Sequence, residues 1–407
     1  MRKPAILLVL TLVSLCLTAC WNRTELNKLS ITSATAMDYE NGEWMITFQV
    51  VIPSAISSGV GTVGGGTSQS PIAVHTSRGK TIREAVSNSN FESPRWLFFA
   101  HNSVIIISEQ VARSGGLNQI VDLYFRNPDA RETVNVLVTT ENARDVLQQM
   151  MHLEKIPGQG LREIMAIEAR YSSTLPSIML YELAMGMTSA SKGAVIPEII
   201  ISGTKKVDSM NDLSHTSVTS VLKLGRLGVI KDGKLTGWLT RNESLGVSLI
   251  TNKVKSSVLP FACKPSDGQN YNSSYRLDTS KTKIVPKKVN GRFVMEINIK
   301  GNGMLLETDC PLELNKPDVV KQLEKQLQNQ IKTMVETSWK ATRRLHVDIL
   351  GFADIIHRKF PKDWKTMRNQ WDSAFQDIEI ETKVHITMSR IGLSTKSFKA
   401  ITKDEEG

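Results

Sequence analysis

The stretch PDVVKQLEKQLQNQIKTMVETSWKATRRL, residues 317–345, predicts the longest helix of the chain. Pro317 and Asp318 suit a helix start, because the first turn can lack an amide hydrogen and its positive end favours a carboxylate. Apolar side chains recur at steps of three and four residues, so the helix has one apolar stripe that must be buried. The stripe consists of Val320, Leu323, Leu327, Ile331, Met334, Val335 and Leu345.

Hairpin signals surround this helix. Asp232-Gly233 separates residues 219–230 from 235–239, and Asn290-Gly291 precedes residues 293–299. Both dipeptides are typical of two-residue hairpin turns. We therefore expect an α+β fold in which helices cover one face of a largely antiparallel sheet. The other elements predicted here are strands at 253–259, 304–307 and 378–388 and helices at 352–359 and 363–375.

The N-terminal half alternates strands with helices, which predicts a mixed or partly parallel sheet. The expected strands are 29–37, 44–52, 104–108, 133–140 and 195–201, and the expected helices are 81–90, 117–125, 142–151, 160–171 and 177–187. The Gly- and Ser-rich residues 53–70 predict a surface loop. The polar residues 203–217 predict a boundary between an N-terminal domain at 20–202, long enough for two subdomains, and an α+β domain at 215–400.

The first twenty residues end in Leu17-Thr18-Ala19-Cys20, after a short basic start and an uncharged apolar run. This pattern predicts a lipoprotein signal peptide at 1–19, cleaved before Cys20, whose thiol takes a diacylglyceryl group and whose new amino terminus takes an acyl chain. The alternative is an uncleaved membrane anchor, but the run is shorter than the ~20 residues that cross a bilayer. We expect no other membrane span.

The charge distribution and the two remaining cysteines each allow more than one interpretation. Residues 20–202 carry 14 Lys and Arg against 17 Asp and Glu, and residues 203–407 carry 34 against 23. The basic half suits anionic lipid headgroups or an acidic partner, or is simply a solvated surface; an exported protein should not meet nucleic acid. Cys263 and Cys310 either form a disulfide or remain two buried thiols, and we favour the thiols.

No pattern in the sequence indicates catalysis or a cofactor. Gly79-Lys80-Thr81 lacks the upstream glycine of a phosphate-binding loop and, with Glu84, predicts a capped helix start instead. His346, Asp348, Asp354 and His357 lie near one another without a metal-ligand spacing, and we expect them to be structural. No G-x-S-x-G sequence occurs. We therefore expect a binding or scaffolding protein with no metal site and no cofactor apart from its covalent lipid.

Several motifs, in order along the chain, resemble those of the Ger(x)C (GerAC-like) family, the lipoprotein C subunits of spore germinant receptors in endospore-forming bacteria. The lipid cysteine is followed at once by Trp21 and then by Glu25-Leu26. Asn22 and Asn127 depart from the acidic residues more usual in the family. The other matching residues are Gly79, Thr81, Glu84-Ala85, Pro94-Arg95, His101, Val104-Ile105, Asp122, Arg126, Arg131, Gly237-Trp238-Leu239, Glu243, Gly246, Asp348, Gly351, Pro361 and Trp364.

The resemblance implies a non-enzymatic subunit on the outer face of the spore inner membrane, held by lipid and assembled with integral-membrane A and B subunits. It implies a response to small germinants, and leaves open which germinant is sensed and whether this subunit binds it. Besides Cys20, we expect structural or interface roles for Trp21, Arg95, His101, Arg126, Arg131, Trp238 and Glu243. Two other functions compete with this one: a solute-binding lipoprotein of a membrane transporter, and a cell-wall enzyme.

Overall fold

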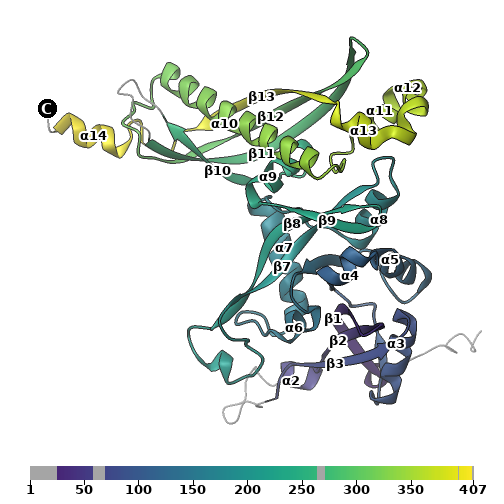
Figure 1. Ribbon diagram of the computed structural model, residues 1–407. Helices are drawn as coiled ribbons and strands as arrows, with labels where there is room; N and C mark the ends of the chain where they lie inside the picture. The colour runs from purple at the N-terminus through teal and green to yellow at the C-terminus, as the bar shows by residue number, and fades with distance from the viewer. Residues whose placement is uncertain (1–24, 58–68, 264–270, 393, 406–407) are drawn as a thin grey trace, which may run out of the picture.

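The computed structural model describes residues 25–57, 69–263, 271–392 and 394–405, which form two lobes (Figure 1). Each lobe is built on its own sheet, and a buried helix lies at the joint between them. The predicted α+β architecture is confirmed. The predicted signal peptide at 1–19 and the predicted lipid site Cys20 lie outside the described residues, as do residues 58–68 of the predicted loop at 53–70. The loop prediction was wrong for its first residues, because Pro53–Ser57 form helix α2.

The first lobe contains a nine-stranded mixed sheet with the order β3-β2-β1-β5-β6-β7-β8-β9, and β4 pairs with the start of β1 off this path. Strands β1, β5, β6 and β7 run parallel, and the other neighbours on the main path are antiparallel. The strands are β1 (Leu29–Glu40), β2 (Glu43–Val51), β3 (Ile72–Gly79), β4 (Trp96–Phe98), β5 (Val104–Ser108), β6 (Asn135–Thr139), β7 (Gly193–Gly203), β8 (Ser220–Lys231) and β9 (Lys234–Leu239).

Helices cover both faces of this sheet, as the central strands require. Alternate residues of β5 point to opposite faces: Val104 and Ile106 join one hydrophobic cluster, whereas Ile105 and Ile107 join the other. All five strand residues are buried, which is typical of a parallel strand between two helix layers. The helices are α2 (Pro53–Ser57), α3 (Ile82–Asn88), α4 (Glu109–Ser114), α5 (Leu117–Arg126), α6 (Ala143–Gln148), α7 (Pro157–Tyr171) and α8 (Leu180–Thr188).

The first sheet continues beyond the polar segment where we expected a domain boundary. Residues 204–219 connect β7 to β8, and these two strands pair along almost their whole lengths. Strand β9 then pairs with β8, so the sheet ends at Leu239. The polar segment is therefore a connection within one sheet, and the second lobe begins only after Leu239.

The second lobe has a four-stranded sheet with the order β10-β11-β12-β13. Strands β10 to β12 are antiparallel, as predicted, but β13 joins parallel to β12. The reason is the connection: helices α10 to α13 lie between the two strands, and such a crossover returns the chain in the same direction. The elements are β10 (Ser257–Cys263), β11 (Tyr271–Val289), β12 (Arg292–Thr308), α10 (Pro317–Arg344), α11 (Phe352–Lys359), α12 (Pro361–Met367), α13 (Trp371–Gln376), β13 (Glu379–Arg390) and α14 (Phe398–Glu405).

The predicted long helix is present as α10, which lies along one face of this sheet (Figure 1). Leu323, Leu327, Ile331 and Val335 are buried at the expected spacing. The preference for thiols at Cys263 and Cys310 was wrong, because the two residues form a disulfide. This bond closes a loop with a sequence separation of 47 residues, and a loop of this size stabilises the fold by about 4 kcal/mol in the chain-entropy account.

Helix α9 (Arg241–Ile250) joins the lobes and was not predicted. It follows the last strand of the first sheet, precedes the first strand of the second, and is buried from Glu243 to Ile250. Its partner is α10, and the two backbones come close at Gly246. A Cβ atom added to Gly246 would overlap the Ser338 hydroxyl and lie 2.9 Å from the Met334 carbonyl oxygen.

We expect Gly246→Val to push α9 away from α10 and to lower the free energy of unfolding by about 2 kcal/mol or more, within the range of overpacked cores. Urea denaturation followed by circular dichroism measures the change. Asn242→Val, at an exposed position of the same helix, is the control and should change stability by no more than about 0.5 kcal/mol. Equal stability of the two variants would contradict the close-packed joint.

Candidate functional site: a surface groove and the joint between the lobes

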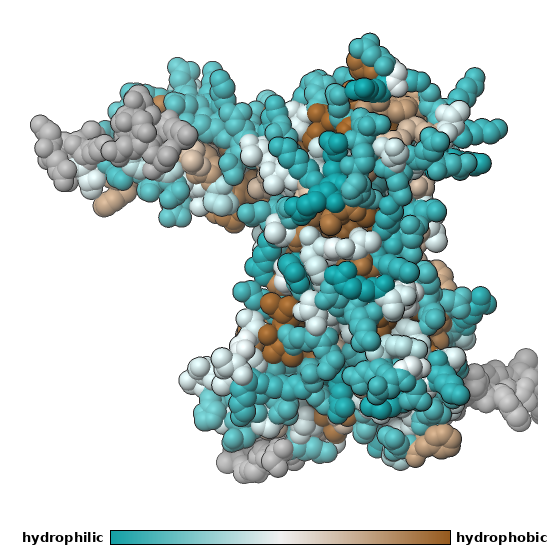
Figure 2. Space-filling view, in the orientation of Figure 1, coloured by the Kyte–Doolittle hydropathy of each residue, from teal (hydrophilic) through white to brown (hydrophobic). Residues whose placement is uncertain are grey.

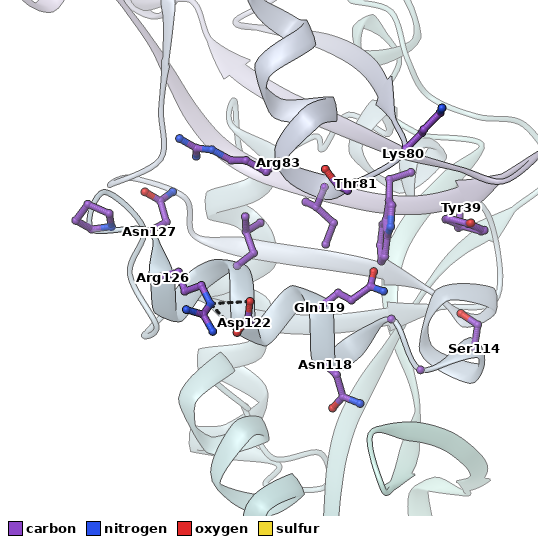
Figure 3. Close-up of a pocket in the computed structure, with 16 residues that line it drawn as sticks. Tyr39, Lys80, Thr81, Arg83, Ser114, Asn118, Gln119, Asp122, Arg126 and Asn127 are labelled. Carbon is purple, nitrogen blue, oxygen red and sulfur yellow. Dashed lines mark hydrogen bonds and ion pairs between the residues drawn. The ribbon is translucent and has the colours of Figure 1, made fainter.

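An open groove of about 1080 Å³ lies between the start of α3 and the length of α5 (Figure 3). Its apolar floor contains Trp44, Ile82 and Leu123, and its rim is polar. Two of the motifs singled out in the sequence face each other across it. Lys80, Thr81 and Arg83 come from the α3 side, and Asn118, Gln119, Asp122, Arg126 and Asn127 come from α5 and its end.

The α3 side of the groove is a capped helix start, as predicted. The Thr81 hydroxyl accepts the Glu84 amide, and the Glu84 carboxylate accepts the Lys80 amide. Residue 79, directly before this turn, must be a glycine, because a Cβ atom there would overlap the amide nitrogen of Ala85. The amides of Lys80 and Glu84 thus have partners within the chain, and the glycine serves close packing.

Positive charge dominates the rim. Arg126 donates from Nε to both carboxylate oxygens of Asp122, at 2.9 Å each, and this ion pair raises the pKa of Arg126. The side chains of Lys80 and Arg83 have no hydrogen bond or ion pair to any described residue. A rim with two unpaired cations above an apolar floor suits a ligand or partner segment that carries carboxylates beside an apolar group.

Three other predicted site residues lie exposed on the first lobe. Arg95 precedes β4, His101 follows it, and Arg131 lies in the connection from α5 to β6. The His101 ring contacts the Phe98 ring with centroids 5.8 Å apart. Neither the Arg95 nor the Arg131 side chain bonds to another described residue. Their exposure fits the interface role that the sequence left open better than a role in holding loops together.

Trp238 lies half-buried in β9 and is enclosed by charged groups. The Arg226 guanidinium stacks 4.4 Å from its ring centre, and its indole N–H donates to Glu109 of α4 at 3.3 Å. Arg226 also forms a two-bond ion pair with the buried Glu198 of β7, which raises the pKa of Arg226. Trp238 therefore links β9 to α4 within the first lobe.

Glu243 belongs to the joint. Its carboxylate accepts the Thr240 amide at 2.7 Å in a capping box at the start of α9. Its other oxygen lies 3.3 Å from Arg344, in the last turn of α10. One carboxylate thus caps the joining helix and connects it to the end of the helix against which it packs.

Asp348 organises the segment that follows α10. It is 3% exposed, and its two oxygens accept the amides of Phe352 and Ala353 at 3.0 and 2.7 Å. Asp354 accepts the Ala190 amide of the first lobe at 3.1 Å, and the His357 ring packs against Trp364. The two carboxylates bond to backbone amides, and no group of three or more potential metal ligands is present in the described part of the chain.

Burial raises the pKa of Asp348 from its ordinary value of 3.8 to about 6, although the two amides oppose this shift. Between these pH values the folded chain binds more protons than the unfolded chain. Stability contributed by this group should therefore fall by about 2 kcal/mol as the pH rises from about 4 to about 6.

The measurement is the free energy of unfolding in urea across this pH range. Asp348→Asn should remove this part of the slope. Asp318→Asn, whose side chain is 98% exposed in α10, should keep the full slope. Identical slopes in the wild type and Asp348→Asn would contradict the assignment.

The chain belongs to the GerAC-like family of spore germination proteins. The family model described as "Spore germination protein N-terminal domain" matches residues 22–201, and "Spore germination B3/ GerAC like, C-terminal" matches residues 225–392. The resemblance seen in the sequence is thereby confirmed.

Relatives align along nearly the full chain. Spore germination protein KC of Bacillus subtilis (strain 168) is 27% identical over 413 residues, covering 100% of both chains. Spore germination protein B3 of the same organism is 24% identical, covering 94% of this chain and 97% of the relative. The crystal structure of the GerBC protein has the same fold, with a TM-score of 0.56, 18% identity and coverage of 88% of this chain and 97% of that one.

Sequence reasoning found both sides of the groove but not the groove itself, because nothing in the spacing of residues 79–84 and 122–127 shows that they meet. Trp21, like Cys20, lies outside the described residues. None of the helices in the described ranges has the length and apolar character needed to cross a bilayer.

Proposed function

We propose that this chain is a non-enzymatic lipoprotein C subunit of a spore germinant receptor, held by lipid on Cys20 at the outer face of the spore inner membrane. The observation that carries the proposal is the full-length similarity to spore germination proteins such as KC and B3. The leader ending in Leu17-Thr18-Ala19-Cys20 supports the lipid anchor. Integral-membrane A and B subunits of the same receptor are the proposed partners.

The groove between α3 and α5 supports a binding role on the first lobe. Its unpaired cations and apolar floor fit an acidic, partly apolar segment of a partner subunit. The two lobes have different topologies, one mixed with nine strands and one with four. A solute-binding lipoprotein usually has two similar lobes around a cleft, so the structure offers that alternative no support.

We expect mass spectrometry of the native protein to find Cys20 as the amino-terminal residue, carrying a diacylglyceryl group and an N-acyl chain. Cys20→Ala should leave the leader attached, reduce recovery in spore membranes and delay germination with the cognate germinant. Cys16→Ala is the matched control, because Cys16 lies inside the leader and should not affect processing. An unmodified thiol at position 20 would contradict the anchor.

We expect Lys80→Glu/Arg83→Glu to reduce co-purification of the A and B subunits from detergent-solubilised membranes. Neither side chain bonds to a described residue, and acidic residues near a helix start are favourable, so the melting temperature should not fall. Lys325→Glu/Lys340→Glu, an equal charge change on the exposed surface of α10, is the control. Unchanged co-purification of the groove variant would exclude the groove as the contact, without affecting the Cys20 result.

A further inference from the structure

An exposed aromatic group lies beside the first strand of the fold. Trp96 is 63% exposed although it lies in β4, and two residues along the strand Phe98 faces the same way and contacts His101. Leu97 between them points inward and is 6% exposed. The exposed cation Arg95 precedes this group. We call Arg95, Trp96, Phe98 and His101 the aromatic edge.

The aromatic edge lies where the chain enters the fold. Strand β4 pairs parallel with the start of β1, and Trp96 stands opposite Leu29. Leu29 directly follows the short 3-10 turn Leu26–Lys28. In Figure 1, β1 and α3 lie in the first lobe, at the opposite end of the molecule from β13.

Chain length limits the distance from the aromatic edge to a lipid on Cys20. Five residue steps separate Cys20 from Glu25, the first described residue, and a fully extended chain spans about 3.6 Å per step, hence about 18 Å. The 3-10 turn adds about 2 Å per residue, and neighbouring strands lie about 4.8 Å apart. Lipid attached to Cys20 therefore lies within roughly 30 Å of Trp96, even with the connecting chain stretched out.

We propose that the aromatic edge inserts into the headgroup region of the bilayer that receives the lipid of Cys20. This proposal rests on the proposed lipid anchor, and it assigns a second, non-covalent membrane contact to the first lobe. Tryptophan favours this region because its ring is apolar and its N–H remains in contact with water and headgroups. Arg95 can contact lipid phosphate while its methylene groups lie along the rings.

The tether explains how a small contact can be effective. Once one end of the chain is held in the bilayer, the aromatic edge meets lipid at a high effective concentration, so even weak insertion is populated. A single tether at Cys20 permits rotation, whereas a second contact at Trp96 fixes which end of the first lobe faces the membrane. The groove between α3 and α5 is in the same lobe and would then have a defined orientation.

The test uses the chain from Trp21 with a hexahistidine tag in place of the lipid cysteine, attached to phosphatidylcholine–phosphatidylglycerol vesicles through nickel-chelating lipid. Trp96→Cys is labelled with the environment-sensitive dye NBD. Phe398→Cys on α14 is the matched control, because Phe398 is an aromatic residue with 78% exposure on the second lobe. Cys263 and Cys310 are bonded to each other and do not react.

We expect attachment to shift NBD emission at position 96 to shorter wavelength and to leave emission at position 398 unchanged. We also expect Trp96→Ser/Phe98→Ser to weaken vesicle binding of the tagged protein about tenfold, equivalent to about 1.4 kcal/mol, relative to Phe398→Ser. Unchanged emission at position 96 in vesicle-bound protein, or equal binding of the two serine variants, would overturn the proposal.

The tag replaces the native lipid in this experiment, so its result does not depend on whether Cys20 is acylated in spores. Mass spectrometry at position 20 tests the anchor separately. The vesicle measurements can therefore contradict membrane insertion of the aromatic edge without contradicting the lipid anchor, and mass spectrometry can do the reverse.

Discussion

The close contact between α9 and α10 is the constraint on which the arrangement of the lobes depends. Helix α9 is the chain segment that leaves the first sheet and enters the second, and α10 covers the second sheet. Their backbones can approach only because residue 246 has no side chain to meet Ser338. A second close contact lies at Gly237 in β9, where a Cβ atom would lie 2.5 Å from a methyl group of Leu345 at the end of α10. A single hydrophobic cluster consequently runs through both lobes, and the molecule resists separation at this point.

The residues that carry the family resemblance divide into two physical groups. Glu243, Gly246 and Asp348 are at the joint, where they cap α9, allow close packing or bond to backbone amides. By contrast, Arg95 and Arg126 are exposed on the first lobe. The first group accounts for the shape, and the second is available for contact with other molecules. Figure 2 agrees with this division: hydrophobic side chains gather near the middle of the molecule where the lobes meet, and the visible surface elsewhere is mostly hydrophilic.

Helices and strands with a clear hydrophobic pattern could be predicted from the sequence. An element that is buried on all sides has no alternation of polar and apolar residues and was missed. Helix α10 has one polar and one apolar side, and β5 is a short apolar run, so both were found. Helix α9 is buried on all sides from Glu243 onward and shows no amphipathic period; only its capping box, Thr240 and Glu243, marked its start. The parallel direction of β13 and the pairing of Cys263 with Cys310 depend on how distant segments meet. Neither local propensity nor spacing contains that information, and the same reason explains why the groove was missed.

The orientation inferred from the aromatic edge also bears on the basic second half of the chain. In the first sheet, five strand spacings of about 4.8 Å separate β1 from β9, so the second lobe begins roughly 24 Å from β1, the first strand of the fold. This distance exceeds the Debye length of about 8–10 Å at physiological salt, so if the aromatic edge contacts a bilayer, the lysines of the second lobe would be largely screened from its headgroups. Lys281, Lys300 and His385 stand opposite one another across β11, β12 and β13, all exposed. Lys281 and Lys300 are like charges directly opposite each other, which weakens a sheet, so a negatively charged group bound between them would stabilise this pair of strands.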